Sequence, residues 1–208
     1  MKHIYLIRHG ESESNVDVYE YCNTKDRDIR LTEKGERQCV IAGDFLIGFL
    51  ESSHIEKIRT FYSPFLRAKQ THDIILEGVP VLSSAPHDLL VEQDYGFDLE
   101  KTKEDIDEIM SDAKLSMSQN IYFYKKSKIG ESPADVVERI KPFVDEFILN
   151  DDGNHVIIVA HGTSIRAISH YLMQANPEEF EYTPKNTAIK KLVVKKGKCI
   201  DGGWIYTP

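Results

Sequence analysis

The sequence predicts an α/β fold, specifically a three-layer α/β/α sandwich with a mostly parallel central sheet. Short apolar runs typical of buried strands alternate with amphipathic segments of helical period along most of the 208 residues. The stretch 98–130 breaks this alternation, because it is acidic at first and then aromatic and basic. We therefore expect residues 1–208 to form a single domain, with 98–130 as a small cap insertion over the carboxyl edge of the sheet.

The N-terminal half supplies three of the expected strands. In order, we expect a strand at 3–7, a helix at 31–53, a strand at 58–63, a helix at 63–76 and a short strand at 79–82. Thr32 is the expected N-cap of the first helix. Ser63 is the expected N-cap of the second, with Pro64 at its first position.

The C-terminal half continues the alternation and closes the sheet. We expect a helix at 131–148, a strand at 155–160, a helix at 163–173 and a hairpin at 188–205. Ser132 and Asp135 form a capping pattern, and Pro142 predicts a kink in the first of these helices. Lys196 and Gly197 are the expected turn of the hairpin.

Composition excludes several classes of protein. The net charge of -8 disfavours a nucleic-acid binder, whose contact surface is basic. Neither a secretory leader nor an apolar run long enough to cross a membrane is recognisable. The three cysteines are few, odd in number and far apart, which favours a reducing, cytoplasmic compartment. The sequence leaves open whether the protein is a monomer or a homodimer.

Three of the expected strands end in residues typical of phosphate sites. Arg8-His9-Gly10 ends the first, the second leads to Arg67 one helical turn later, and His161-Gly162 ends the apolar strand at 155–160. Ligands bind at the carboxyl ends of parallel strands, so these residues should meet in one crevice. Two arginines, two histidines and free helix N-termini suit a dianionic phosphate. Glycine after each histidine would let the backbone approach the anion closely.

Most other histidines and arginines have a plainer interpretation. A single histidine is usually a surface or hydrogen-bonded residue, and a single arginine is usually solvated. We apply that interpretation to His3, His54, His72, His87, His155, His170, Arg27, Arg30 and Arg139.

Six motifs, in this order, resemble the histidine phosphatase (phosphoglycerate mutase-like) superfamily. They are "LIRHGESESN", "LTEKGERQ", "YSPFLRAKQT", "LVEQDYG", "GES" and "VAHGTSIRA", and they span Arg8 to about Arg166. The resemblance implies that His9 is the nucleophile and that Arg8, Asn15, Arg67, His161 and Gly162 surround the phosphate. It implies that Glu92 protonates the leaving oxygen, although Glu11, Glu13, Asp94 and Asp98 are rival carboxylates. Tyr95 and Lys125 are possible substrate contacts.

The resemblance favours the phosphatase branch. It implies a metal-independent hydrolysis of a small phosphorylated metabolite through a phosphohistidine, with no cofactor. One alternative is a cofactor-dependent phosphoglycerate mutase, but such mutases carry an arginine directly after the acid, where this chain has Gln93. The other alternative is a binding module without turnover. Neither a cysteine-phosphatase motif, nor a Walker-type loop, nor a zinc motif is found in the sequence.

Overall fold

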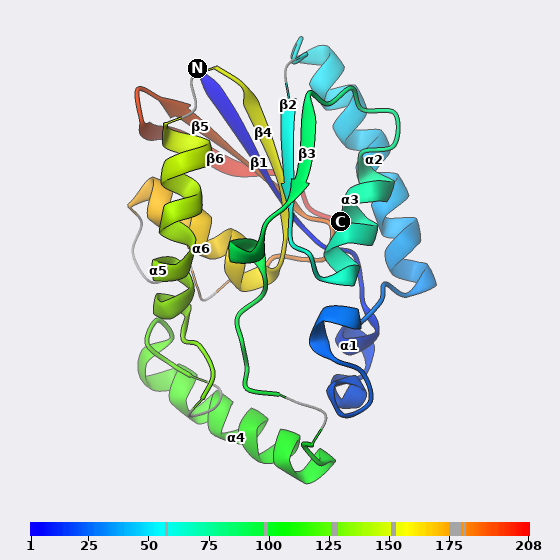
Figure 1. The fold of residues 1–208 in the computed structure, drawn as a ribbon, viewed down its shortest axis with the longest axis vertical. Coiled ribbons are helices and arrows are strands. Elements are labelled where there is room, and N and C mark those ends of the chain that lie inside the picture. Colours follow the sequence, from blue (N-terminus) through cyan, green and yellow to red (C-terminus); the bar gives the residue numbers. More distant parts are fainter. Residues whose placement is uncertain (57, 98–99, 126–128, 151–152, 175–179, 181) are drawn as a thin grey trace.

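The computed structural model contains a six-stranded sheet with the order β3-β2-β4-β1-β5-β6 (Figure 1). The strands are β1 (Lys2–Arg8), β2 (Ile58–Tyr62), β3 (Ser83–Pro86), β4 (His155–Ala160), β5 (Ile189–Lys195) and β6 (Lys198–Tyr206). The first four run parallel to one another, β5 runs antiparallel to β1, and β6 runs antiparallel to β5. The predicted mostly parallel sheet is confirmed.

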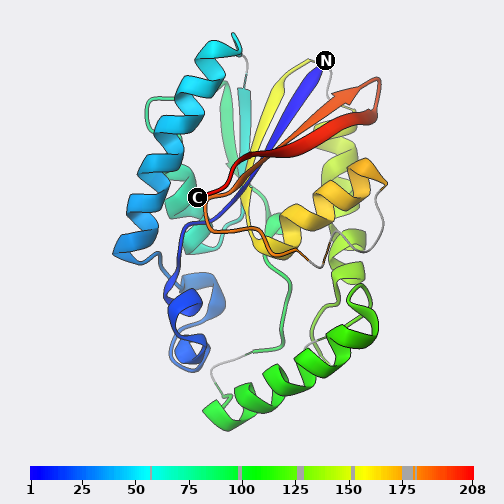
Figure 2. The ribbon, with the colours of Figure 1, turned by 180° about the vertical axis from the view of Figure 1, so that it is seen from behind.

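Helices cover both faces of this sheet. Figures 1 and 2 show α2 and α3 on one face and α5 and α6 on the other, so the predicted three layers are confirmed. The long helices are α2 (Glu33–Ser52), α3 (Leu66–Ile75), α4 (Lys103–Asn120), α5 (Pro133–Val144) and α6 (Gly162–Met173). Shorter helical segments are α1 (Glu13–Val16), η1 (Val18–Cys22), η2 (Asp26–Asp28), η3 (Asp88–Leu90) and η4, a π-helical turn at Asp145–Leu149.

The structure describes residues 1–56, 58–97, 100–125, 129–150, 153–174, 180 and 182–208, and only the backbone of 112–120. Within these ranges, no helix combines the length and the apolar composition that crossing a membrane requires.

The core lies on both faces of the sheet because the central strands carry unbroken apolar runs, residues 4–7 in β1 and 156–160 in β4. Ile4 and Leu6 of β1 pack toward α5 and α6, whereas Tyr5 and Ile7 pack toward α2 and α3. β4 alternates in the same way and is buried from Val156 to Ala160. Successive side chains point to opposite faces of the sheet, and both faces are buried. These strands therefore appear in the sequence as continuous apolar runs rather than as alternating ones.

Local signals placed several element ends correctly. The Thr32 hydroxyl accepts from the Gly35 N–H at 3.0 Å and caps α2. The Ser132 hydroxyl accepts from Asp135 N at 3.2 Å and caps α5. Lys196 and Gly197 turn the hairpin with φ of 51° and 71°, which is left-handed backbone.

Two predicted boundaries were wrong. The strand expected at 79–82 lies at Ser83–Pro86, where it is an edge strand that is mostly exposed, so an apolar pattern could not find it. Helix α3 begins at Leu66 with Phe65 at its N-cap, so Ser63 is not the cap.

Helix α4 lies within 98–130, the stretch for which the sequence predicts a cap. It lies beyond the carboxyl ends of the strands, apart from the two helical layers (Figure 1). The Tyr19 hydroxyl of η1 donates to Asp107 at 2.8 Å, and Lys103 lies 4.8 Å from the centre of the Tyr19 ring. These contacts join α4 to the segment that follows β1.

Candidate active site

The two glycine-flanked histidines lie side by side because β1 and β4 are parallel neighbours. Arg8 is in register with Ala160, and the His9 N–H donates to the Ala160 carbonyl at 3.0 Å. The rings of His9 and His161 follow these positions with centroids 5.2 Å apart. Both are almost fully buried, with 3% and 0% of their surface exposed.

His9 is held in the form that can act as a nucleophile. Its Nδ1 lies 2.7 Å from the carbonyl oxygen of Gly10. A carbonyl only accepts, so Nδ1 carries the proton and the lone pair lies on Nε2. Burial, followed by the charges of Arg67 and Arg8, holds the pKa of His9 well below its ordinary value of 6.5. The imidazole is therefore neutral at physiological pH.

His161 resembles His9 in its surroundings. Burial, then the charge of Arg67, holds its pKa well below the ordinary value. Its Nε2 lies 2.7 Å from the Ser63 hydroxyl, so Ser63 orients this ring rather than capping a helix. Its Nδ1 is buried and has no hydrogen-bond partner in the described part of the chain.

Two guanidinium groups, those of Arg8 and Arg67, lie beside the two histidines and complete the predicted phosphate site, which we call the cradle. Arg67 reaches it from the first turn of α3 and is 2% exposed. One of its nitrogens lies 2.6 Å from the Asp26 carbonyl and 2.8 Å from the Asp26 carboxylate. Arg8 donates to the Pro184 carbonyl at 2.5 Å, while its buried Nε–H has no partner among the described residues. A phosphate oxygen would satisfy such a donor.

Glu92 lies at the N-terminus of α6. Its carboxylate accepts from Thr163 N at 3.1 Å and from Gln93 N at 2.9 Å. The position expected for a Cβ of Gly162 lies 3.7 Å from both the Glu92 carboxylate and Arg8 Nε, so this glycine borders the acid and the cradle. Of the rival carboxylates, Glu11 is bound to Lys34 at 2.6 Å. Asp98 lies outside the described residues.

The predicted residues converge on a cavity of about 170 Å³. Its walls include six of them: Arg8, His9, Asn15, Arg67, Glu92 and Tyr95. The side-chain oxygen of Asn15 accepts from Ser12 N at 3.2 Å and from Asn186 at 2.9 Å, so its NH₂ group is the end left to donate.

Two predicted residues serve the fold instead. Lys125 pairs with Asp135 at 2.8 Å at the start of α5 and is not among the described residues that line the cavity. A Cβ on Gly10 would lie 2.7 Å from the Gly35 carbonyl and 2.8 Å from Cys39 Sγ. The glycine at this position therefore allows close packing of the chain on α2.

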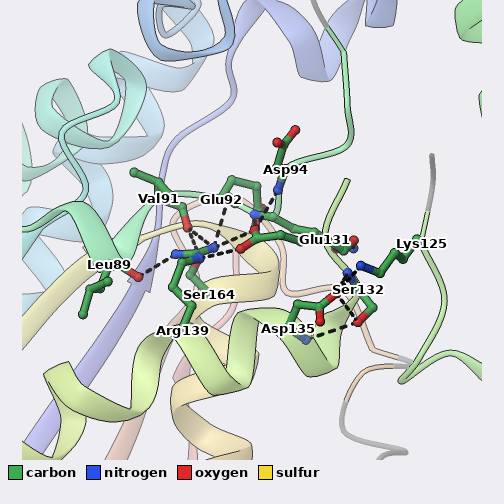
Figure 3. Close-up of polar contacts among 11 residues, drawn as sticks. Leu89, Val91, Glu92, Asp94, Lys125, Glu131, Ser132, Asp135, Arg139 and Ser164 are labelled. Atoms are coloured by element: carbon green, nitrogen blue, oxygen red, sulfur yellow. Dashed lines mark hydrogen bonds and ion pairs between the residues drawn. The ribbon is translucent and has the colours of Figure 1, made fainter. Parts of the chain in front are cut away.

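Arg139 was expected to be solvated, and that expectation was wrong. Figure 3 shows its guanidinium beneath the loop that carries Glu92. It donates to Leu89 O at 2.7 Å, to Val91 O and Glu92 O at 3.3 Å each, and to Glu131 at 2.7 Å and 3.0 Å. The Ser164 hydroxyl also donates to Val91 O, at 2.6 Å. Arg139 thus fixes the backbone on either side of the candidate acid.

Several residues of the site carry no sequence signal. Tyr21 of η1, Phe97 of the loop after Glu92 and Met110 of α4 line the cavity of the site. Asp26 of η2 lines a second cavity beside it, which shares Tyr21 and Phe97 with the first. They come from segments without apolar periodicity, so only their placement in space reveals them. Other histidines behave as expected, since His72 bonds to Thr60 at 3.1 Å and forms part of the fold.

Comparison with known proteins places the chain in a family. Residues 4–201 match the profile of the histidine phosphatase superfamily (branch 1). The phosphoglycerate mutase-like protein AT74 of Arabidopsis thaliana is 28% identical over 94% of this chain, which spans 66% of that protein. The 2,3-bisphosphoglycerate-dependent phosphoglycerate mutase of Beijerinckia indica is 31% identical over 84% of this chain and 83% of its own length. The structure of a mycobacterial glucosyl-3-phosphoglycerate phosphatase shares the fold, with a TM-score of 0.71, 23% identity and coverage of 93% of both chains. The chain therefore belongs to the histidine phosphatase superfamily.

Proposed function

We propose that the protein is a phosphomonoester hydrolase that works through a phosphohistidine and needs no metal ion. The observation that carries the proposal is the neutral His9, with its Nε2 lone pair, beside Arg8 and Arg67 in a cavity of about 170 Å³.

In the first step, Nε2 of His9 attacks phosphorus as the bond to the leaving oxygen breaks. The arginines and His161 stabilise charge on the equatorial oxygens. Glu92 supplies the proton that the leaving oxygen takes up, a contribution of about 10²–10⁴-fold for a poor leaving group. In the second step, water attacks the phosphorus of phospho-His9, Glu92 accepts a proton from it, and the P–N bond breaks to release phosphate.

Transfer to a phosphoglycerate is the second candidate, because a bisphosphoglycerate-dependent mutase is 31% identical. The position of Gln93 supports hydrolysis over transfer. Gln93 is 4% exposed, donates to the Glu131 carbonyl at 2.7 Å and accepts from the Thr163 hydroxyl at 3.1 Å. It offers nothing to a substrate carboxylate.

The test is an assay in EDTA of the wild type and of His9→Ala. The substrates are p-nitrophenyl phosphate, and 3-phosphoglycerate with 2,3-bisphosphoglycerate. Release of phosphate that disappears in His9→Ala supports the hydrolase. Isomerisation without net phosphate release would make the protein a mutase. A folded protein with neither activity would favour the binding module.

A further inference from the structure

A second cavity adjoins the phosphate cradle. It has a volume of about 370 Å³, within the range of small-molecule sites. Four residues line both cavities: Tyr21, Glu92, Tyr95 and Phe97. Glu92 is the candidate acid, so the group attached to the leaving oxygen must extend from the cradle past Glu92 into this second cavity.

Aromatic rings form much of its wall. The rings of Tyr21 and Phe97 have centroids 4.9 Å apart, and those of Tyr95 and Phe97 are 5.8 Å apart. Phe65 adds a fourth ring and lies 5.2 Å from the guanidinium carbon of Arg67. Such faces bind flat apolar groups by stacking and attract cations through the ring quadrupole.

The charges of the cavity are mainly negative. Asp26, Asp94 and Glu131 line it together with Glu92, and Arg139 is the one cation among its described lining residues. Arg139 is already engaged by Glu131 and by three carbonyls. Asp94 is exposed and forms no salt bridge in the described part of the chain, and its backbone N–H is bound to Glu131.

These charges determine which substrates the cavity can hold. A second anionic group, such as a carboxylate or another phosphate, would lose its hydration and meet the Asp94 carboxylate, which has no ion-pair partner among the described residues. The nearby cations are already engaged, Arg67 by Asp26 and Arg139 by Glu131. An ammonium group would find the Asp94 carboxylate and the ring faces. The phosphate itself is not penalised, because Arg8 and Arg67 lie in the first cavity.

We propose that this second cavity is the leaving-group site and that it selects phosphomonoesters of neutral or cationic, ring-bearing alcohols or phenols. It rejects esters that carry a second anionic group. This inference rests on the proposed hydrolase function and adds to it the class of substrate.

The test compares two esters that differ in the charge at their far end. Tyramine O-phosphate carries an ammonium, and the O-phosphate of 4-hydroxyphenylacetate carries a carboxylate, on phenols of similar acidity. We expect kcat/KM to favour the tyramine ester by about tenfold or more at low salt, and the ratio to shrink as salt is added. Glycerol 3-phosphate should likewise exceed 3-phosphoglycerate.

The variant Asp94→Asn should lower the tyramine preference, because it removes one charge while its side-chain oxygen can still accept from Gly96 N, as Asp94 does at 2.7 Å. The matched control is Asp44→Asn, an exposed position on α2 outside both cavities, where the ratio should not change.

Equal or reversed kcat/KM values for the two esters would overturn the inference and leave the hydrolase standing. A preference that Asp94→Asn does not alter would overturn the assignment to this cavity. Absence of His9-dependent turnover of either ester, by a folded protein, would instead refute the proposed function and the inference with it.

Discussion

Arg139 offers the sharpest test of how the candidate acid is held. The variant Arg139→Met keeps the apolar stem and removes the guanidinium, so Glu131 loses its cation and the carbonyls of Leu89 and Glu92 lose the donor that Arg139 supplies. The side chains of Arg139 and Glu131 are 18% and 24% exposed. Their pairing should therefore lie between a surface ion pair, worth about 0–1 kcal/mol, and a buried one, whose disruption costs about 3–5 kcal/mol.

We accordingly expect Arg139→Met to lower the free energy of unfolding by about 2–3 kcal/mol, measured by urea denaturation. Lys141→Met is the matched control on the same helix. Lys141 pairs with Glu138 at the surface, so its loss should cost at most about 1 kcal/mol.

The kinetic effect should depend on the leaving group. Displacing Glu92 removes the proton that an alkoxide needs, so kcat/KM for an alkyl phosphate, which reports the first step, should fall by about ten- to a hundredfold. The p-nitrophenolate ion leaves without a proton, so kcat/KM for p-nitrophenyl phosphate should change little. Glu92→Gln should reproduce this pattern. An equal loss on both substrates, or none on either, would refute the role of Arg139 in positioning the acid.

Three further predictions concern the cradle. The pKa values of His9 and His161 are held below 6.5 in the folded chain, so the unfolded chain binds protons there first as pH falls. Below about pH 6.5, each of the two histidines should lower the free energy of unfolding by up to about 1.4 kcal/mol per pH unit. In His9→Gln, the pH dependence measured by urea titration should be smaller by the contribution of one histidine. Gly10→Ala should destabilise the fold by about 1–3 kcal/mol, because its Cβ would lie 2.7 Å from a backbone carbonyl of α2; an unchanged thermal midpoint would contradict this. Asp26→Asn should tighten binding of inorganic phosphate, because the carboxylate 2.8 Å from Arg67 no longer competes with it; calorimetry should show a lower Kd, and a higher one would count against the competition.

The sequence was informative where functional side chains come directly after a buried strand. Arg8, His9 and His161 could be placed together because apolar runs identify β1 and β4, and parallel strands bring their carboxyl ends to one edge. Arg139 could not be interpreted correctly from its spacing. Its partners lie 8 to 50 residues away, and a charged residue on an amphipathic helix looks solvated until the loop above it is known.

The same limit applies to the second cavity, the proposed leaving-group site. Tyr21, Asp26 and Phe97 come from short helical turns and a loop, whose conformations depend on contacts with distant segments. The edge strand β3 was misplaced for a related reason, since its exposed residues carry no apolar pattern.

The strand order also bears on how the protein folds. β1 is the first strand along the chain, yet it lies between β4 and β5, which are the fourth and fifth. Ile4 pairs with Val156 and with Leu192, so these contacts close loops of most of the chain length. Such closure is slow and costs entropy before any contact stabilises it. Until β5 is in place, one edge of β1 stays open to pairing with other chains. Refolding should thus be sensitive to protein concentration, and fragments that end before Ile189 should aggregate rather than retain partial activity.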